Sequence, residues 1–306
     1  MAEAGFNWFN RVGVPSDSYS RQLKFLGSLD SVFVNMNYQG NLHKMHSHYE
    51  DPVVYELELR GQTLKLNDWI GKRIQIEYLK QIECIHCGRK TSKSFNQGYC
   101  YPCFRDLAQC DLCIMSPEKC HFHLGTCREP EWGLANCMKP HIIYLSNTSG
   151  VKVGITRESQ LPTRWIDQGA LQALPILRVS KRYYSGLIET AFKKHLSDRT
   201  NWRTMLKNEV EPLDLFGVFE SCWPDVKAEI DDELKDDLEV IASPDGVLEF
   251  QYPAKQYPSK VVSFNLDKNP VLEGQLNAVK GQYLILDNGV INIRKYAGYL
   301  VNIVLS

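Results

Sequence analysis

The 306-residue sequence lacks a long apolar run and lacks an excess of charge of either sign. No segment approaches the roughly 20 apolar residues that a membrane-spanning helix needs, so we expect no membrane association. The formal net charge is −1 at pH 7, and any contact with nucleic acid must therefore come from a local basic face. The first residues also lack the basic start and apolar stretch of a signal peptide. We expect a soluble, cytoplasmic protein.

The composition is otherwise that of a globular protein. Hydrophobic residues make up 43% of the chain, which suffices for a buried core, and the length allows two or three domains. The patterns described below predict an α+β fold in several parts. These are an N-terminal β-rich module (1-82), a zinc-binding region (83-140), an α/β domain (141-207), a linker with an acidic helix (208-259) and a C-terminal β-barrel-like module (260-306).

Cysteine is concentrated in one stretch, since nine of the ten cysteines lie between Cys84 and Cys137. Six of them form three C-x-x-C pairs, which begin at Cys84, Cys100 and Cys110. A C-x-x-C loop directs two thiolates at one ion, and two such loops complete a closed, tetrahedral Zn(Cys)4 site. Turn-forming residues accompany the first two pairs, since Gly88 follows the first, Gly98 precedes the second and Pro102 lies within the second. The alternative is a disulfide framework or a set of buried thiols, which a reducing compartment disfavours.

The spacing leaves open which cysteines share an ion. In the simplest arrangement the first two C-x-x-C pairs hold one zinc, whereas a cross-braced arrangement joins the first pair to the third. The other ligands would come from the remaining cysteines and from His121, His123 or His141. We expect two structural zinc ions, and the number of ligands allows a third; His86 is expected to be a spectator. The predicted ligands are Cys84, Cys87, Cys100, Cys103, Cys110, Cys113, Cys120, Cys127, Cys137 and His123.

The two ends of the chain show the alternating pattern of half-buried strands. Strands are expected at 53-59 and 73-79, after a possible short helix at 20-29. Near the other end, Asn288-Gly289 predicts a hairpin with a type I′ turn.

The two ends also resemble each other. Segment 65-79 aligns with 292-306, which places Trp69 on Tyr296 and Gly71 on Gly298, and Gly40-Asn-Leu resembles Gly274-Gln-Leu. Two small β-modules, or one barrel shared between the ends, would explain the likeness, and chance similarity is the alternative. Small barrels often bind single strands or protein partners, although a fold alone does not determine function.

Residues 141-207 predict a β-hairpin, a helix, a strand and a second helix, in that order. The first helix is expected after Pro162, which suits a first-turn proline, and the second is expected to begin at an N-cap Ser185. A linker at 208-224 and a solvated acidic helix at 225-239 follow.

This order of elements and its motifs resemble the GIY-YIG nuclease-like domain. Within 141-207, IIY supplies Tyr144, VKVGIT supplies Gly154, PTRW supplies Arg164 and LIETAFKKHL supplies Glu189. The K-V-G-I-T segment is similar to the branch in which lysine replaces the second tyrosine, at Lys152, and a threonine follows the glycine, at Thr156.

The resemblance implies a site for phosphodiester hydrolysis. Glu189 would hold Mg²⁺ or Mn²⁺, Tyr144 or Lys152 would activate water, and Arg164 would stabilise charge on the phosphate. Gly154 would let the hairpin backbone approach the substrate. The structural alternative is an ion pair between Arg164 and Glu189 with Tyr144 packed on it.

Basic residues interleaved with aromatic ones follow in the sequence, a pattern typical of nucleic-acid binding, although a solvated helix surface also explains Lys193 and Lys194. The basic residues are Lys181, Arg182, Lys193, Lys194, His195, Arg199 and Arg203. The predicted nucleic-acid contacts are Gly154, Thr156, Arg182, Lys193 and Arg203.

Nearly the whole chain also resembles an uncharacterised bacterial family of unknown function, through GTCREPEW, VKVGIT and RWIDQGA. We therefore predict a zinc-stabilised protein that binds DNA or RNA and hydrolyses phosphodiester bonds. The alternatives are a non-catalytic adaptor that docks nucleic acid or a protein partner through the β-modules, and a redox enzyme that uses the C-x-x-C pairs.

Overall fold

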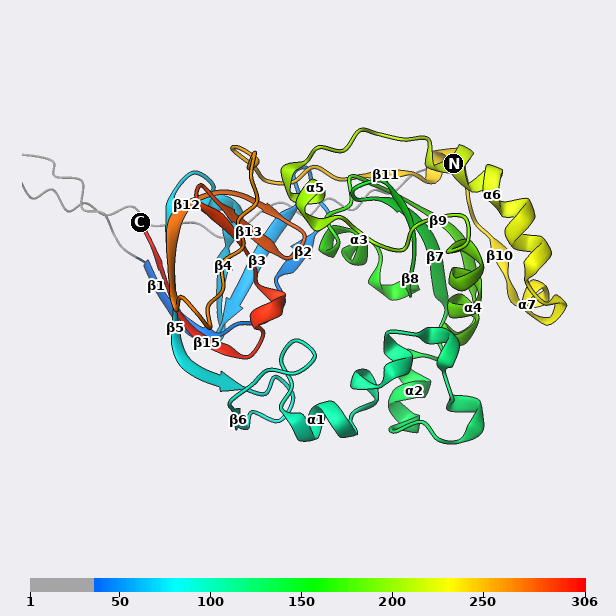
Figure 1. Cartoon of the computed structure of the whole chain (residues 1–306), viewed down its shortest axis with the longest axis horizontal. Helices are drawn as coiled ribbons and strands as arrows, with labels where there is room; N and C mark the ends of the chain where they lie inside the picture. The colour runs from blue at the N-terminus through cyan, green and yellow to red at the C-terminus, as the bar shows by residue number, and fades with distance from the viewer. Residues whose placement is uncertain (1–35) are drawn as a thin grey trace, which may run out of the picture. The chain divides into compact units, whose positions relative to one another are not determined.

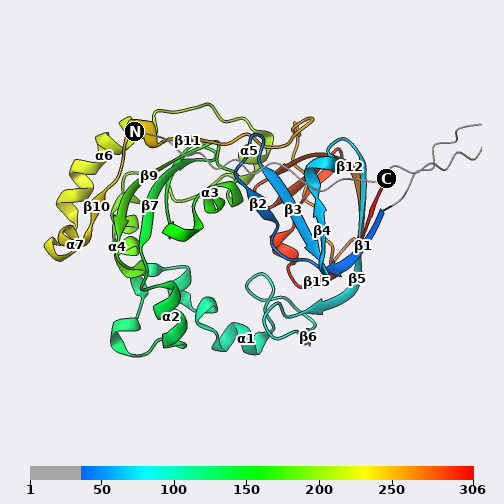
Figure 2. The same ribbon diagram turned by 180° about the vertical axis from the view of Figure 1, so that it is seen from behind.

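The structure, a computed structural model, describes residues 36–306 and contains three antiparallel sheets joined by short helices (Figures 1 and 2). The predicted α+β class is confirmed, and the sheets in these residues do not close into a barrel. The helix expected at 20-29 lies outside the described residues. None of the helices in the described part of the chain combines the length and apolar character needed to span a bilayer.

The largest sheet is built from both ends of the chain. Its strand order is β1-β15-β5-β12-β13-β14, with β6 paired to the end of β5. The bounds are β1 (Met36–Asn41), β15 (Tyr299–Leu305), β5 (Arg73–Glu83), β12 (Val271–Lys280), β13 (Tyr283–Leu286), β14 (Gly289–Asn292) and β6 (Lys90–Thr91). Alternate residues of β5 and β15 are buried, as the period-2 pattern predicts. The ends therefore share one sheet, but this sheet is open in the described residues and is not the shared barrel that the sequence left as one of two arrangements.

The two ends are related by an approximate two-fold symmetry within this sheet. β1 pairs with β15 as β12 pairs with β5, and β15 and β5 pair with each other. The aligned glycines occupy equivalent positions, because Gly40 stands opposite Val301 and Gly274 stands opposite Ile74. The predicted repeat is thus a structural one.

The hydrogen bonds at the starts of β15 and β5, the two inner strands of the repeat, also correspond. Leu42 N donates to Tyr299 O at 2.8 Å, and the equivalent Leu276 N donates to Lys72 O at 2.8 Å. Each inner strand follows a short 3-10 helix, η1 (Leu66–Trp69) or η8 (Arg294–Tyr296). The aligned glycines between helix and strand have φ values of 86° and 88°, a conformation that favours glycine.

The hairpin of β13 and β14 forms where it was expected, but its turn differs. Leu286 pairs with Gly289, so the two turn residues are Asp287 and Asn288. Neither has a positive φ, so the predicted type I′ turn at Asn288-Gly289 is wrong. Gly289 lies in the strand, where an added Cβ would stand 2.7 Å from the Phe264 ring.

A three-stranded sheet lies over the same hydrophobic core. It consists of β2 (His46–His48), β3 (Val54–Leu59) and β4 (Gln62–Lys65). Tyr55 and Leu57 of β3 are fully buried, in one continuous core with Ile76 of β5 and Trp165 of the α/β part. This shared core joins the β-rich and α/β parts.

The α/β part contains the predicted hairpin, helix, strand and helix. The bounds are β7 (His141–Asn147), β8 (Val151–Arg157), η6 (Glu158–Gln160), α3 (Thr163–Asp167), β9 (Gln172–Val179) and α4 (Arg182–Phe192), and the short strands β10 (Glu239–Val240) and β11 (Leu248–Glu249) pair with β9. The predicted N-cap Ser185 is wrong, because α4 begins earlier. The buried Ser185 hydroxyl donates instead to the Arg182 carbonyl inside the helix, at 2.7 Å.

The predicted linker at 208-224 is also wrong, because most of it is helical. After α5 (Trp202–Lys207) come α6 (Leu215–Glu229), α7 (Asp232–Asp237) and η7 (Pro244–Gly246). The buried residues of α6 have helical spacing and join the core beneath β7 and β9; they are Leu215, Phe219, Cys222 and Val226. Pro224 lies within α6, whereas the sequence predicted that the helix would begin only after this proline. The acidic segment is accordingly divided between α6 and α7.

The cysteine-rich segment contains short helical turns between β6 and β7. They are α1 (Tyr101–Asp106), η2 (Ala108–Cys110), η3 (Leu112–Ile114), η4 (Pro117–Lys119), η5 (Phe122–Leu124) and α2 (Pro130–Asn136). This segment packs against α4 at Gly186, where an added Cβ would lie 2.5 Å from Glu118 N and 2.6 Å from Pro117 Cβ. The close approach fixes the cysteine-rich segment against the α/β part.

Candidate metal centre and adjoining cleft

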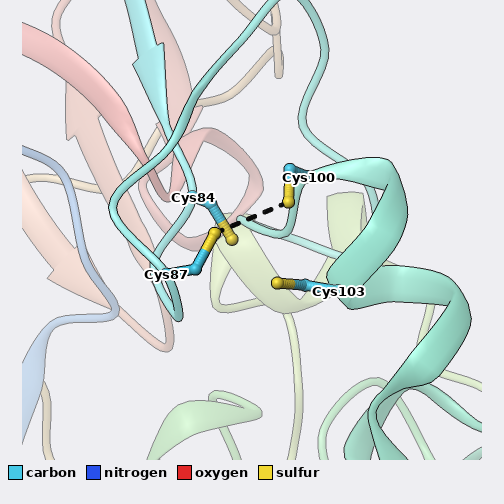
Figure 3. A group of neighbouring side chains, drawn as sticks. All are labelled: Cys84, Cys87, Cys100 and Cys103. Carbon is cyan, nitrogen blue, oxygen red and sulfur yellow. Dashed lines mark hydrogen bonds between the residues drawn. The ribbon is translucent and has the colours of Figure 1, made fainter.

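Four cysteines of the first two C-x-x-C pairs meet at the end of β5. The sulfur atoms of Cys84, Cys87, Cys100 and Cys103 all lie within 4.8 Å of one another, and Figure 3 shows the side chains turned toward a common centre. Four thiolates in one small group match the closed coordination of a structural zinc ion. This grouping agrees with the simplest arrangement expected from the sequence.

The backbone around these cysteines is shaped to hold thiolates. The Gly88 N–H donates to the Cys84 carbonyl at 2.9 Å, and Gly88 has a φ of 69° that closes the loop. Burial raises the pKa of the Cys84 thiol, but N–H groups of Cys87, Cys100 and His86 outweigh burial and lower the pKa to about 6. Zinc binds the thiolate form, so these N–H groups favour the ligand state of Cys84, whereas burial and the neighbouring cysteines raise the pKa of Cys103.

The third C-x-x-C pair is divided between two places. Cys110 ends η2 and Cys113 lies in η3, with an extended Asp111 between the two turns. Cys113 forms a second group with Asp111 and His121, whose ligand atoms lie within 4.8 Å of one another. Cys110 belongs to neither group, and the cross-braced arrangement is not formed.

The second group has partners that bear on metal binding. Asp111 is paired with Arg128 at 2.7 Å and lies 3.5 Å from His121. Three further predicted ligands surround the same small cavity as Cys113, namely Cys120, Cys127 and Cys137. The predicted ligand His123 is in neither group, because its ring packs 5.8 Å from that of Tyr183. This region offers ligands for a second ion without fixing which of them bind it.

All four predicted catalytic side chains line one cavity. Tyr144 comes from β7, Lys152 from β8, Arg164 from α3 and Glu189 from α4, and the cavity has a volume of about 530 Å³. Four of the predicted nucleic-acid contacts share the lining: Gly154, Thr156, Arg182 and Lys193. The fold thus brings the four predicted catalytic residues together with four of the predicted nucleic-acid contacts.

Gly154 also has a role that was not expected. It stands opposite Tyr144 in the hairpin, and a Cβ there would lie 2.7 Å from the Tyr144 ring and hydroxyl. The glycine therefore makes room for Tyr144. The Tyr144 hydroxyl donates to Gln168 Oε1 at 3.0 Å, which aims it at the cavity. Burial raises the pKa of Tyr144, and Arg164 offsets part of the rise, so this group stays protonated near neutral pH.

The charged groups in the cavity shift one another's pKa values. Burial, followed by repulsion from Arg164, lowers the pKa of Lys152 to about 8. Burial raises the pKa of Glu189, and its ion pair with Lys193 at 3.2 Å offsets part of that rise. Lys193 also lies 3.4 Å from Asp198. The ion pair between Arg164 and Glu189, which was the structural alternative to a catalytic site, is not formed. Within residues 36–306 no nitrogen of Arg164 lies within 4.0 Å of a carboxylate oxygen of Glu189.

The predicted basic face is dispersed rather than continuous. The partly buried Arg182 donates to the Ile114 carbonyl at 2.7 Å, and Lys194 pairs with Glu229 at 2.6 Å. Arg203 lies over the Trp202 ring at 4.3 Å and does not line the cavity. Adjacent residues of a helix point in different directions, so proximity in sequence did not make one surface.

A second, larger cavity of about 910 Å³ adjoins the first. The two share Arg164, Arg294, Ile114, Met115 and Gln109, and together form the feature that we call the basic cleft. Its lining contains eight lysines and arginines, namely Lys44, Arg60, Lys152, Arg157, Arg164, Arg182, Lys193 and Arg294, against three acidic residues, Glu58, Glu189 and Asp198. A nearly neutral chain thus concentrates positive charge on one concave surface.

Comparison with known proteins identifies a family. Residues 71–301 match the model of a family described as "Protein of unknown function (DUF2797)". No curated protein and no solved structure matches the chain. The matched stretch includes the four-cysteine group, the catalytic candidates and Arg294.

Proposed function

Since the chain belongs to the DUF2797 family, whose function is unknown, we propose a function from its own geometry. The protein binds DNA or RNA in the basic cleft and hydrolyses phosphodiester bonds there with a divalent metal ion, while zinc stabilises the fold. The observation that carries the proposal is the convergence of Tyr144, Lys152, Arg164 and Glu189 on one cavity. The GIY-YIG-like order of elements in 141–207 supports it.

The charge of the cleft supports a polyanionic substrate. Eight basic side chains face it in a chain whose net charge is −1. Contacts to the phosphate backbone supply most of the affinity of proteins that bind nucleic acid without sequence preference. The surface therefore suits a nucleic acid better than a neutral small molecule.

The residues present fit a hard divalent cation. Mg²⁺ is usually bound through one or two carboxylates together with substrate phosphates, and Glu189 and Asp198 both line the cavity. Glu189 would hold the ion, and Lys193, now between the two carboxylates, would turn toward the substrate. When bound, Mg²⁺ or Mn²⁺ supplies Lewis-acid stabilisation of negative charge on phosphate oxygens.

The other side chains divide the remaining tasks. Lys152, with its pKa lowered to about 8, accepts the proton of the attacking water at Nζ. Tyr144 stays protonated, because its pKa is raised, and orients that water through its hydroxyl. Arg164 faces the cavity without a carboxylate partner in residues 36–306 and stabilises the charge that develops on the phosphate.

A nicking assay on the full chain tests the proposal. Purified protein is incubated with labelled single-stranded and double-stranded DNA and RNA in Mg²⁺ or Mn²⁺. We expect Arg164→Ala and Glu189→Gln each to reduce cleavage by at least about a hundredfold, as loss of a transition-state contact does. Zinc content should remain that of the wild type.

Matched controls lie outside the cleft. Arg178→Ala and Glu239→Gln remove an exposed ion pair at 3.5 Å and should leave cleavage unchanged. Cleavage by an Arg164→Ala/Glu189→Gln double variant at the wild-type rate contradicts the site. Salt-dependent binding without cleavage by the wild type would instead establish the adaptor function, for which Lys152 in place of the second tyrosine is the supporting observation.

A further inference from the structure

Arg164 and Arg294 lie where the two cavities of the basic cleft join. They line both cavities, although Arg164 comes from α3 and Arg294 begins η8 in the second copy of the β repeat. Sequence reasoning singled out Arg164 and missed Arg294. The fold thus brings two guanidinium groups from distant segments to one concave place.

Neither arginine has a carboxylate within ion-pair distance among the described residues. Within residues 36–306 the side chains of Arg164 and Arg294 form no ion pair, whereas Arg73, Arg128 and Arg178 each do. Burial and then repulsion from Arg164 lower the pKa of Arg294, and Asp167 offsets part of this effect. A partly buried cation beside another cation is costly unless an anion completes the site.

The repeat gives a comparison for Arg294, because the other copy carries a structural asparagine at the same position. In the alignment of 65–79 with 292–306, Asn67 occupies the position of Arg294. Asn67 serves structure, because Oδ1 accepts from Tyr55 N at 2.9 Å and Nδ2 donates to the Val53 carbonyl at 2.9 Å. Within the described residues the side chain of Arg294 makes no such bonds and faces the cleft instead.

We propose that Arg164 and Arg294 together bind one phosphate group at the junction of the two cavities. Paired guanidinium forks match the oxygens of a phosphate, which would balance both charges at once. Resting on the proposed function, this phosphate belongs to the nucleic-acid backbone next to the bond that is cut. The strand then runs from the catalytic cavity into the larger cavity, past the exposed Met115.

Two binding measurements on the full chain test this inference. Titration with inorganic phosphate, followed by ³¹P NMR, probes the anion site alone. We expect Arg294→Gln and Arg164→Gln each to weaken phosphate binding by at least about tenfold, the effect of one charge-assisted contact. The second measurement is the binding of a labelled single-stranded oligonucleotide at several salt concentrations. In each variant, the slope of log K against log salt concentration should be smaller in magnitude than that of the wild type by about one.

The control and the stability of the variants separate binding from structure. Arg73→Gln removes an arginine on β5 that is paired with Glu273 outside the cleft, and it should leave phosphate binding unchanged. Without phosphate, Arg294→Gln should unfold at the same or a higher temperature, because an unpaired charge is removed. A lowered unfolding temperature would mark a structural arginine and overturn the inference.

The remaining outcomes distinguish this inference from the proposed function. Phosphate binding equal to the wild type in Arg294→Gln overturns the site, even if the protein cleaves nucleic acid. Loss of phosphate binding in that variant upholds the site, even if no nucleic acid is bound or cut, and the ligand is then a free phosphate compound.

Discussion

At the scale of single residues, the buried Lys152 is the most unusual group in the cavity. It is 6% exposed on β8 and has no ion pair among the residues described. Burial and the nearby Arg164 lower its pKa to about 8 from an ordinary value of 10.5. A lysine that loses its proton near this pH can act as a base, which gives a reason for keeping a costly buried amine.

The pH dependence of cleavage tests this role. Below about pH 8 Lys152 holds its proton and cannot accept another, so the cleavage rate should rise with pH through about 8. Lys152→Met should remove this rise and reduce the rate by at least about a hundredfold. Rates measured between pH 6 and 9 check the expectation. The control is Lys235→Met on α7, and persistence of the rise in Lys152→Met would rule the role out.

Stability should follow the same titration with a defined sign. The pKa of Lys152 is lower in the folded state than in the unfolded state. Below about pH 8 both states hold the proton, and the buried charge lowers the free energy of unfolding by its full amount. The penalty is relieved as pH rises from about 8 toward 10.5. Lys152→Met should therefore raise the free energy of unfolding in urea at pH 7 more than at pH 9.5. An equal effect at both pH values would contradict the shifted pKa.

The cavity residues differ in how far sequence could identify them. Tyr144 and Glu189 lie in motifs with a recognisable order, so a resemblance was enough. Arg294 has no such motif, and it drew attention only because the folding of distant segments places it in the lining that it shares with Arg164. The role of Gly154 depends on cross-strand register with Tyr144, which spacing along one strand does not reveal.

At the scale of elements, local turns decide which cysteines group together. The first C-x-x-C loop is closed by Gly88, whereas the third pair is divided between η2 and η3. Spacing predicted the first group because a short loop constrains its own ends. It could not predict the second, whose ligands depend on how separate turns pack against α2 and α4.

Zinc content tests this grouping. Cys100→Ser removes one ligand of the four-cysteine group and should lower the zinc content by one ion per chain, measured by elemental analysis of purified protein. Cys222→Ser is the matched control, since Cys222 is buried in α6, where its thiol donates to the Phe219 carbonyl. That variant should keep all its zinc. Unchanged zinc in Cys100→Ser would show that the group does not bind the metal.

At the scale of the whole molecule, the first and last strands of the described residues belong to one sheet. β15 lies between β1 and β5, and β12 covers the other edge of β5. Alternation and the internal likeness predicted the strands and the repeat. They could not predict that the copies pair with each other, because interstrand contacts between distant segments leave no local signal.

This pairing predicts that residues 260–306 do not fold alone. Without β5 and β1, both edges of β15 lose their partners and the buried Val301 and Ile303 face water. Circular dichroism of the separate segment should show an unfolded chain, whereas urea unfolding of the full chain should be a single transition for this sheet. A folded segment with dispersed amide signals would show that the C-terminal module is independent.

The shared sheet also bears on when, during synthesis, the two arginines of the proposed phosphate site are both present. The ribosome delivers Arg164 and the rest of the α/β part before β12 and β15. Arg294 and β15 are made later still, and β15 lies between strands that were made much earlier. A nascent chain that ends before Arg294 therefore carries only Arg164 of the proposed anion site, and we expect phosphate affinity only after Arg294 has been added.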